Sequence, residues 1–188
     1  MARIPMLEAK DLGPQDQELL VRNLTSWRVL AHSPNGLRIW GQMIGFFLKQ
    51  SRLDARLREF ALLQIGWLSQ EPYEWSHHVK ISLDIGISEA QIDQLIAYNR
   101  GQPNALDARY LLVMRAATEF FEKPALSQAM VQELQTVMNL ESLSDFVLLL
   151  AFYTGMVRLF ASLEVDVEPE YMRFLDRFAL TGNGGKKE

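Results

Sequence analysis

Three side chains with acid–base chemistry lie within five positions of one predicted helix: Glu74, His77 and His78. The chain has only three histidines in 188 residues, so two adjacent histidines near a carboxylate form a distinctive group. If the helix begins after Glu71, then Glu74 and His78 lie about one turn apart on one face, and His77 flanks them. A carboxylate beside an imidazole raises the proton affinity of the ring and orients it, as a general acid or base near neutral pH requires. The spacing therefore permits proton transfer.

The same spacing also has a purely structural explanation. A carboxylate in the first helical turn is stabilised by the helix dipole and by free backbone N–H groups, which accounts for Glu74 without any function. Glu–His pairs at this spacing contribute only ~0.2–0.5 kcal/mol and arise freely. Aromatic residues near a helix start, here Tyr73 and Trp75, more often anchor a core than line a substrate pocket. His32 has no partner visible in the sequence, and we interpret it as structural.

The residue types restrict metal and redox chemistry. The chain has no cysteine, which excludes disulfides, thiolate nucleophiles and cysteine-ligated zinc or iron–sulfur centres. Glu74 and His77 have the Glu-x-x-His spacing of di-iron carboxylate bundles, but such bundles need two of these motifs. The residue three before His32 is Val29, so a full di-iron site within one chain is excluded. We expect no bound metal.

Composition favours one globular domain that binds neither nucleic acid nor membrane. With 48% hydrophobic and 22% charged residues, the chain is long enough to bury a substantial core. A net charge of -4 provides no overall positive field for nucleic acid or an anionic membrane. Charges interrupt any signal-peptide stretch near the N-terminus, so we expect a cytoplasmic protein. The longest uncharged apolar run, residues 146–157, is twelve residues long, short of the roughly 20 that a spanning helix needs.

Apolar residues recur at three- and four-residue intervals between prolines and glycines, which predicts helices and no strand. Local signals mark the helix ends: Ser33 before Pro34, an Asp54 cap, a capping box from Ser88, and a left-handed Gly86. The longest predicted helix is apolar nearly all round, so we expect other helices to surround it. The predicted helices span about residues 34–49, 55–69, 72–85, 89–99, 106–122, 128–138, 142–163 and 170–178.

These elements predict an all-α, single-domain helical bundle of about seven to eight helices over residues 1–180. Residues 1–50 form an N-terminal helical arm, and residues 54–100 form the core that carries the motif. Residues 181–188 contain three glycines and little to bury, so we expect them to form a flexible tail.

The segment from Leu57 to Leu95, LREFALLQIGWLSQEPYEWSHHVKISLDIGISEAQIDQL, resembles the carboxymuconolactone decarboxylase and alkylhydroperoxidase-D-like family. It is similar to the family's Arg-Glu-Leu helix, its Tyr-Glu-Trp-x-x-His helix and its Gly-hydrophobic-Ser ending. Flanking pieces extend the similarity from Arg3 to Pro169. The resemblance implies an alkylhydroperoxidase-D-like fold and a homo-oligomer, either trimer or hexamer.

The peroxidase branch of this family carries a glutamate and, twelve residues later, Cys-x-x-Cys-x-x-x-His. Anchored on His78, the same frame has Glu59, Glu71 and Glu74 here, so both cysteine positions are glutamates. In hydroperoxide reduction one thiolate is the nucleophile and the second sulfur resolves the intermediate. Peroxiredoxin-type activity is therefore disfavoured.

The remaining residues are similar to the decarboxylase branch, which removes carbon dioxide from a carboxylated lactone of aromatic breakdown without a cofactor. This resemblance implies a small-molecule substrate and three catalytic residues, Glu59, Glu74 and His78, with His78 as proton donor and either glutamate as its partner. The pocket is expected to use aromatic, polar and cationic side chains: Tyr73, Trp75, His77, Glu71, Arg58 and Arg158. Because such a lactone is anionic, at least one of Arg56, Arg58 and Arg158 should face the pocket.

A hypothesis of a different class stays open beside the enzyme. The chain is longer than the compact decarboxylases, and a protein can keep a scaffold after losing its chemistry. A non-catalytic ligand-binding or assembly protein is the alternative.

Overall fold

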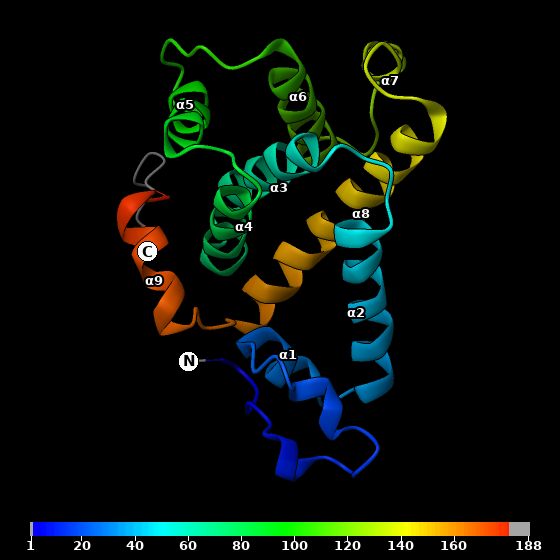
Figure 1. Ribbon diagram of the computed structural model, residues 1–188, viewed down its shortest axis with the longest axis vertical. Coiled ribbons are helices and arrows are strands. Elements are labelled where there is room, and N and C mark those ends of the chain that lie inside the picture. Colours follow the sequence, from blue (N-terminus) through cyan, green and yellow to red (C-terminus); the bar gives the residue numbers. More distant parts are fainter. Residues whose placement is uncertain (1, 181–188) are drawn as a thin grey trace.

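The computed structural model describes residues 2–180, and all the regular structure within them is helical (Figure 1). Two short 3-10 helices, η1 Ala9–Asp11 and η2 Gln17–Leu20, precede nine α-helices: α1 Thr25–Leu30, α2 Pro34–Lys49, α3 Ala55–Ser69, α4 Pro72–Asp84, α5 Glu89–Asn99, α6 Ala108–Glu122, α7 Gln128–Gln135, α8 Leu140–Leu163 and α9 Pro169–Arg177. The all-α prediction is confirmed. The predicted flexible tail, residues 181–188, lies outside the described residues.

The helix ends follow local hydrogen-bonding signals. The Asp54 carboxylate accepts the backbone N–H groups of Arg56 and Leu57 and so starts α3, and a complete capping box from Ser88 starts α5. Gly86 follows α4 with a φ of +86°, a conformation that glycine adopts without strain. About seven to eight helices were predicted, but the described residues have nine α-helices, because no local signal had indicated α1. Helix α6 begins two residues late because Asp107 caps it, α8 begins two residues early after an Asn139 cap, and α7 ends at Gln135.

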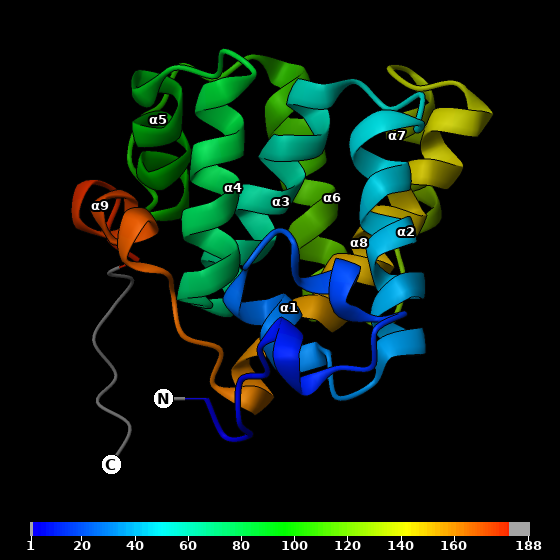
Figure 2. The same ribbon diagram turned by 60° about the horizontal axis from the view of Figure 1, so that its bottom comes forward.

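Helix α3 is the central element of the bundle. Every side chain from Leu57 to Trp67 is buried, and α3 packs against α4, α6 and α8 (Figures 1 and 2). The expectation that α8 is the surrounded helix was wrong, since α8 leaves one face open and Leu148 on it is 49% exposed. Helix α3 can be buried despite its polar residues because these find partners inside: Gln64, for example, donates to Asn99 and Thr118.

Helix α8 is long and apolar enough to cross a membrane by length and composition alone. It has 24 residues, and its most apolar stretch has a mean hydropathy of 1.9. The uncharged run of residues 146–157 is therefore only the middle part of a longer apolar helix. The core helix of a globular protein passes the same test. Here 44% of this apolar stretch is buried within the protein, where α8 packs on α3 and α6.

The first residues cover one end of the bundle, and α9 packs on its side against α4 (Figure 2). Figure 2 shows the first residues (blue) lying across the end of the bundle near α1 and α2, with α9 beside α4. The Arg3 backbone N–H donates to the Leu163 carbonyl at 2.8 Å, and the Thr25 N–H donates to the Glu168 carboxylate at 2.6 Å. These bonds join the two ends of the chain next to the start of α4.

The close approach of α3 and α4 yields a stability prediction. A Cβ on Gly66 would lie 3.3 Å from the Trp75 backbone Cα, whereas one on Gly45 in α2 would meet nothing within 4 Å. Gly45→Ala should raise the free energy of unfolding by roughly 0.5–1 kcal/mol, because alanine is the better helix former. Gly66→Ala should instead lower it by about 1–3 kcal/mol through overpacking. Chemical denaturation of both variants checks this, and equal stabilisation would contradict the close packing.

Candidate active site

Three predicted catalytic side chains meet beneath one pocket. His78 Nδ1 lies 2.7 Å from Glu59 Oε2, and His78 Nε2 lies 3.0 Å from Glu74 Oε1. Glu59 comes from the central helix α3, while Glu74 and His78 lie one turn apart on α4. All three side chains are at least 94% buried. The imidazole is therefore held between two carboxylates away from bulk water.

The charges of this group shift its proton affinities strongly. Burial alone lowers the pKa of His78, but the negative charges of Glu74 and Glu59, together with the hydrogen bond to Glu59, outweigh it and raise that pKa to about 10. Burial alone raises the pKa of Glu59, yet His78 and Arg58 hold it below its usual range. At neutral pH the stable arrangement is an imidazolium between carboxylates. The ring therefore carries a positive charge and a proton that it can donate.

One oxygen of Glu74 has spare hydrogen-bonding capacity. His78 Nε2 approaches Glu74 Oε1 closely enough for charge pairing, but the ring N–H is not aimed at it, and Oε1 has no hydrogen-bond partner among residues 2–180. The short separation makes this contact an ion pair, whereas the angle at the His78 ring N–H is too unfavourable for a hydrogen bond. A buried carboxylate oxygen without a hydrogen bond is costly, and here the ion pair with the His78 imidazolium offsets that cost.

A cavity of about 110 Å³ lies above this group. Its floor contains Glu74, His78 and Tyr153, and its walls are mainly apolar side chains of the arm, α2 and α8: Leu24, Trp27, Trp40, Ile44, Leu48, Met156 and Phe160. The volume is below the roughly 300–1,000 Å³ of pockets for drug-sized ligands. The site therefore suits a compact compound.

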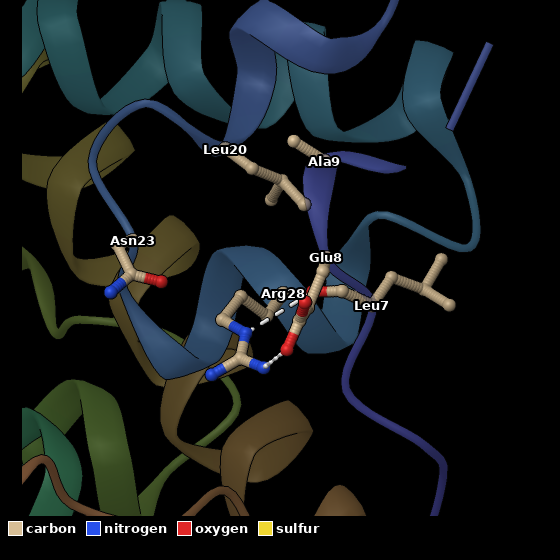
Figure 3. A pocket seen from close by; sticks show the side chains of 6 residues that line it. All are labelled: Leu7, Glu8, Ala9, Leu20, Asn23 and Arg28. Atoms are coloured by element: carbon tan, nitrogen blue, oxygen red, sulfur yellow. Dashed lines mark hydrogen bonds and ion pairs between the residues drawn. The ribbon is translucent and has the colours of Figure 1, made fainter. Parts of the chain in front are cut away.

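A larger hollow elsewhere has no comparable chemistry. It measures about 320 Å³ and lies among Leu7, Glu8, Leu20, Asn23 and Arg28. In Figure 3 its arginine already reaches the glutamate and the Leu7 carbonyl. Because its one cation is occupied and no buried acid–base group lines it, the smaller cavity is the better candidate for an active site.

Some predicted pocket residues lie elsewhere. Tyr73 and His77 line the cavity, but Trp75, Glu71, Arg58 and Arg158 do not. The Trp75 indole N–H donates to the Phe178 carbonyl at 2.7 Å, inside the core. Glu71 caps α4 by accepting the Glu74 backbone N–H, and its burial raises its pKa to about 7.

None of the arginines expected to face the pocket does so. Arg58 lies behind Glu59, to which it donates at 2.8 Å, and its other end bonds to the Phe47 carbonyl. Arg56 binds the Tyr110 hydroxyl and the Gly86 carbonyl. Arg158 lies over the Phe121 ring on the outside. The cation at the pocket is instead Arg22 of the N-terminal arm.

Besides the apolar walls, three polar pocket residues were missed by sequence reasoning: Arg22, Ser26 and Tyr153. Tyr153 is 2% exposed, its ring meets that of His78 edge-on at 5.3 Å, and its hydroxyl makes no hydrogen bond within residues 2–180. Burial and the charges of Glu74 and Glu59 raise the pKa of Tyr153 well above its usual value, so the hydroxyl keeps its proton. The run YTG around Tyr153 offered no spacing signal, because its neighbours in space are remote in sequence.

A second polar network supports the wall of the cavity. His77 Nε2 lies 2.8 Å from Glu168 Oε2, and the His77 ring is stacked between Tyr73 and Tyr171. The Tyr73 hydroxyl lies 2.8 Å from Ser26 Oγ and donates to Glu168 at 3.2 Å. Glu168 thus ties the arm and α9 to the start of α4.

Glu168 should make stability depend on acid pH. Burial favours a higher pKa, but the hydrogen bonds from His77 and the Thr25 N–H, with the charge of His77, lower it from 4.5 to about 2. A lowered carboxyl pKa contributes stability that is present above pH 4.5 and is lost as pH falls towards 2. Glu168→Gln should flatten this part of the curve of unfolding free energy against pH. Denaturation at several pH values tests this, with exposed Glu170→Gln as control; equal slopes for wild type and Glu168→Gln would contradict it.

The donor geometry does not form a metal centre. Among residues 2–180, no three His, Asp or Glu side chains are arranged to hold a metal ion. Both ring nitrogens of His78 already face carboxylates, which leaves no imidazole lone pair directed at a metal.

The comparisons with known proteins agree with this picture of the fold. The sequence pattern of the carboxymuconolactone decarboxylase family matches residues 34–119, which include the three catalytic candidates. No curated protein matches the chain significantly. Among solved structures, the chain is similar to the alkylhydroperoxidase AhpD core of an uncharacterized peroxidase-related protein from Ralstonia eutropha JMP134, with a TM-score of 0.76 and 18% identity over 95% of this chain and 97% of that chain. The expected alkylhydroperoxidase-D-like fold is confirmed.

Proposed function

The chain carries a region of the carboxymuconolactone decarboxylase family, residues 34–119, and from this premise we propose that it is a carbon–carbon lyase. Its substrate is a carboxylated lactone or a related compact ring compound, which it decarboxylates without a cofactor. The observation that carries the proposal is the buried series Glu59–His78–Glu74, of which Glu74 and His78 line a largely apolar cavity.

The reaction needs a group that accepts the electron pair of the broken carbon–carbon bond, and then a donor that delivers a proton to carbon. When the bond between the ring carbon and the carboxylate breaks, carbon dioxide leaves and its electron pair enters the unsaturated ring system as an extended enolate. An imidazolium next to that enolate stabilises the new negative charge in a water-poor cavity. The proton of His78 then passes to carbon, and water returns a proton to the imidazole.

The surrounding residues fit this sequence of events. Glu59, held by Arg58 on its other side, orients the His78 ring and keeps it protonated. Glu74 pairs with the His78 ring from the other side and helps to keep it charged, and the Tyr153 hydroxyl can donate a hydrogen bond to the enolate oxygen. Together they position a compact ring beside the His78 imidazole.

Peroxide reduction is the other activity suggested by similarity, since the solved neighbour is named as peroxidase-related. This chain has no cysteine, and the thiolate is the nucleophile in thiol peroxidases. Purified protein given cumene hydroperoxide and a dithiol should therefore consume none of it above the uncatalysed rate.

The test of the proposal is product analysis in deuterated water. Purified protein is incubated with a panel of carboxylated unsaturated lactones, and carbon dioxide release and product mass are followed together. We expect carbon dioxide and one deuteron on carbon in the product of at least one member of the panel. Saturable binding of the panel with no carbon dioxide would overturn the lyase assignment and favour a binding protein on the same scaffold.

A further inference from the structure

The cavity has one permanently cationic residue in its lining, and it comes from the N-terminal arm. Arg22 is exposed, and its guanidinium lies 5.5 Å from the centre of the Trp27 ring. Unlike Arg28, Arg38 and Arg58, which all contact carboxylates, Arg22 has no acidic partner within residues 2–180. It therefore presents an uncommitted cation beside the cavity.

The position of Arg22 is set by the backbone around it. Asn23 has a φ of +47°, and its N–H donates to the Leu20 carbonyl at 3.0 Å, so the chain turns sharply after Arg22. Two residues further on, the Thr25 N–H is bonded to Glu168. The backbone is thereby anchored while the long side chain remains available at the cavity mouth.

The floor of the cavity does not itself attract an anion. The two carboxylates Glu59 and Glu74 are matched by the cations His78 and Arg58, so this buried group is close to neutral. An acidic substrate is then neither repelled nor selected there. The remaining cation in the lining, Arg22, decides charge preference.

We infer that Arg22 recognises an acid group that the substrate retains in the product, while the apolar walls hold the ring and its reacting carbon faces His78. The inference rests on the proposed function for the role of His78. The selectivity lies outside residues 34–119, the region that matches the family.

Binding of simple ring acids tests this inference without any turnover. Benzoate and its uncharged counterpart benzamide are titrated into wild type, Arg22→Gln and Arg22→Lys, with Arg173→Gln as the matched control. Arg173 is also exposed and stacked on an aromatic ring, 4.7 Å from the centre of Phe174, but it lies on α9 away from the cavity.

We expect benzoate to bind to wild type more tightly than benzamide does. Arg22→Gln should weaken the binding of benzoate about tenfold, as the loss of a charged hydrogen bond predicts. Benzamide should bind all variants alike, Arg22→Lys should retain part of the preference, and Arg173→Gln should match wild type. The preference should also decrease with salt, because Arg22 is exposed.

Two results would overturn the assignment: no preference for benzoate in wild type, or unchanged benzoate affinity in Arg22→Gln. Thermal unfolding of each variant shows whether a change in benzoate affinity reflects the substitution itself or a misfolded protein. With a reacting lactone, Arg22→Gln should raise KM far more than it lowers kcat. If no lactone turns over, the proposed lyase fails while the benzoate comparison still decides the role of Arg22.

Discussion

Replacement of His78 by glutamine should lower kcat/KM for the proposed decarboxylation by about 10²–10⁴-fold, the usual contribution of a general acid. Glutamine keeps hydrogen-bonding groups between Glu59 and Glu74 but has no proton to donate to carbon. The measurement is carbon dioxide release and deuterium incorporation, compared with His32→Gln. His32 is outside the cavity, where its ring contacts the Pro5 carbonyl, so this control should retain wild-type turnover.

The pH profile separates a chemical role of His78 from a structural one. Because His78 is active when protonated and its pKa is raised to about 10, kcat/KM should stay level through neutral pH and fall as pH rises through about 10. Glu74→Gln removes one of the charges that raise this pKa, so the fall should move to lower pH. An alkaline limb that does not move in Glu74→Gln would contradict His78 as the acid.

Replacement of Glu59 by alanine should lower the free energy of unfolding by about 3–5 kcal/mol, which is the cost of removing one partner from a buried ion pair. The change leaves the buried Arg58 guanidinium without its carboxylate and opens a gap beside His78. Urea denaturation at pH 7 measures the loss. Glu133→Ala, which breaks the exposed pair with Arg115 at 2.6 Å, should change little.

A second variant distinguishes stranded charge from simple loss of packing. Adding Arg58→Met to Glu59→Ala removes the uncompensated cation and replaces it with an apolar side chain of similar length. The double variant should therefore be more stable than Glu59→Ala alone. Two results would contradict a stabilising role of the buried charge cluster: a free energy of unfolding of Glu59→Ala within about 1 kcal/mol of the wild-type value, or further destabilisation when Arg58→Met is added.

The same cluster explains why hydrophobicity misjudged the centre of the bundle. Helix α3 carries Arg58, Glu59 and Gln64, which lower its mean hydropathy, and yet all three side chains are buried because each finds a partner. Helix α8 looks more like a core helix by composition, but it leaves Leu148 partly open. Burial depends on which partners the fold supplies, and composition does not contain that information.

The sequence by itself determined the features that depend on neighbouring residues. Asp54, the Ser88 capping box and Gly86 mark helix ends through bonds that span at most a few positions, and the i to i+4 pairing of Glu74 with His78 follows from helical geometry alone. The frame of the family resemblance added Glu59.

Tertiary structure alone decided what stands around the imidazole. It brought Arg22 and Tyr153 to the cavity from positions 56 before and 75 after His78, and it turned Arg58 inward to Glu59. These contacts join segments distant along the chain, and no local pattern encodes their pairing. The one arginine in the lining of the cavity could therefore be identified only from the packing of the arm against the bundle.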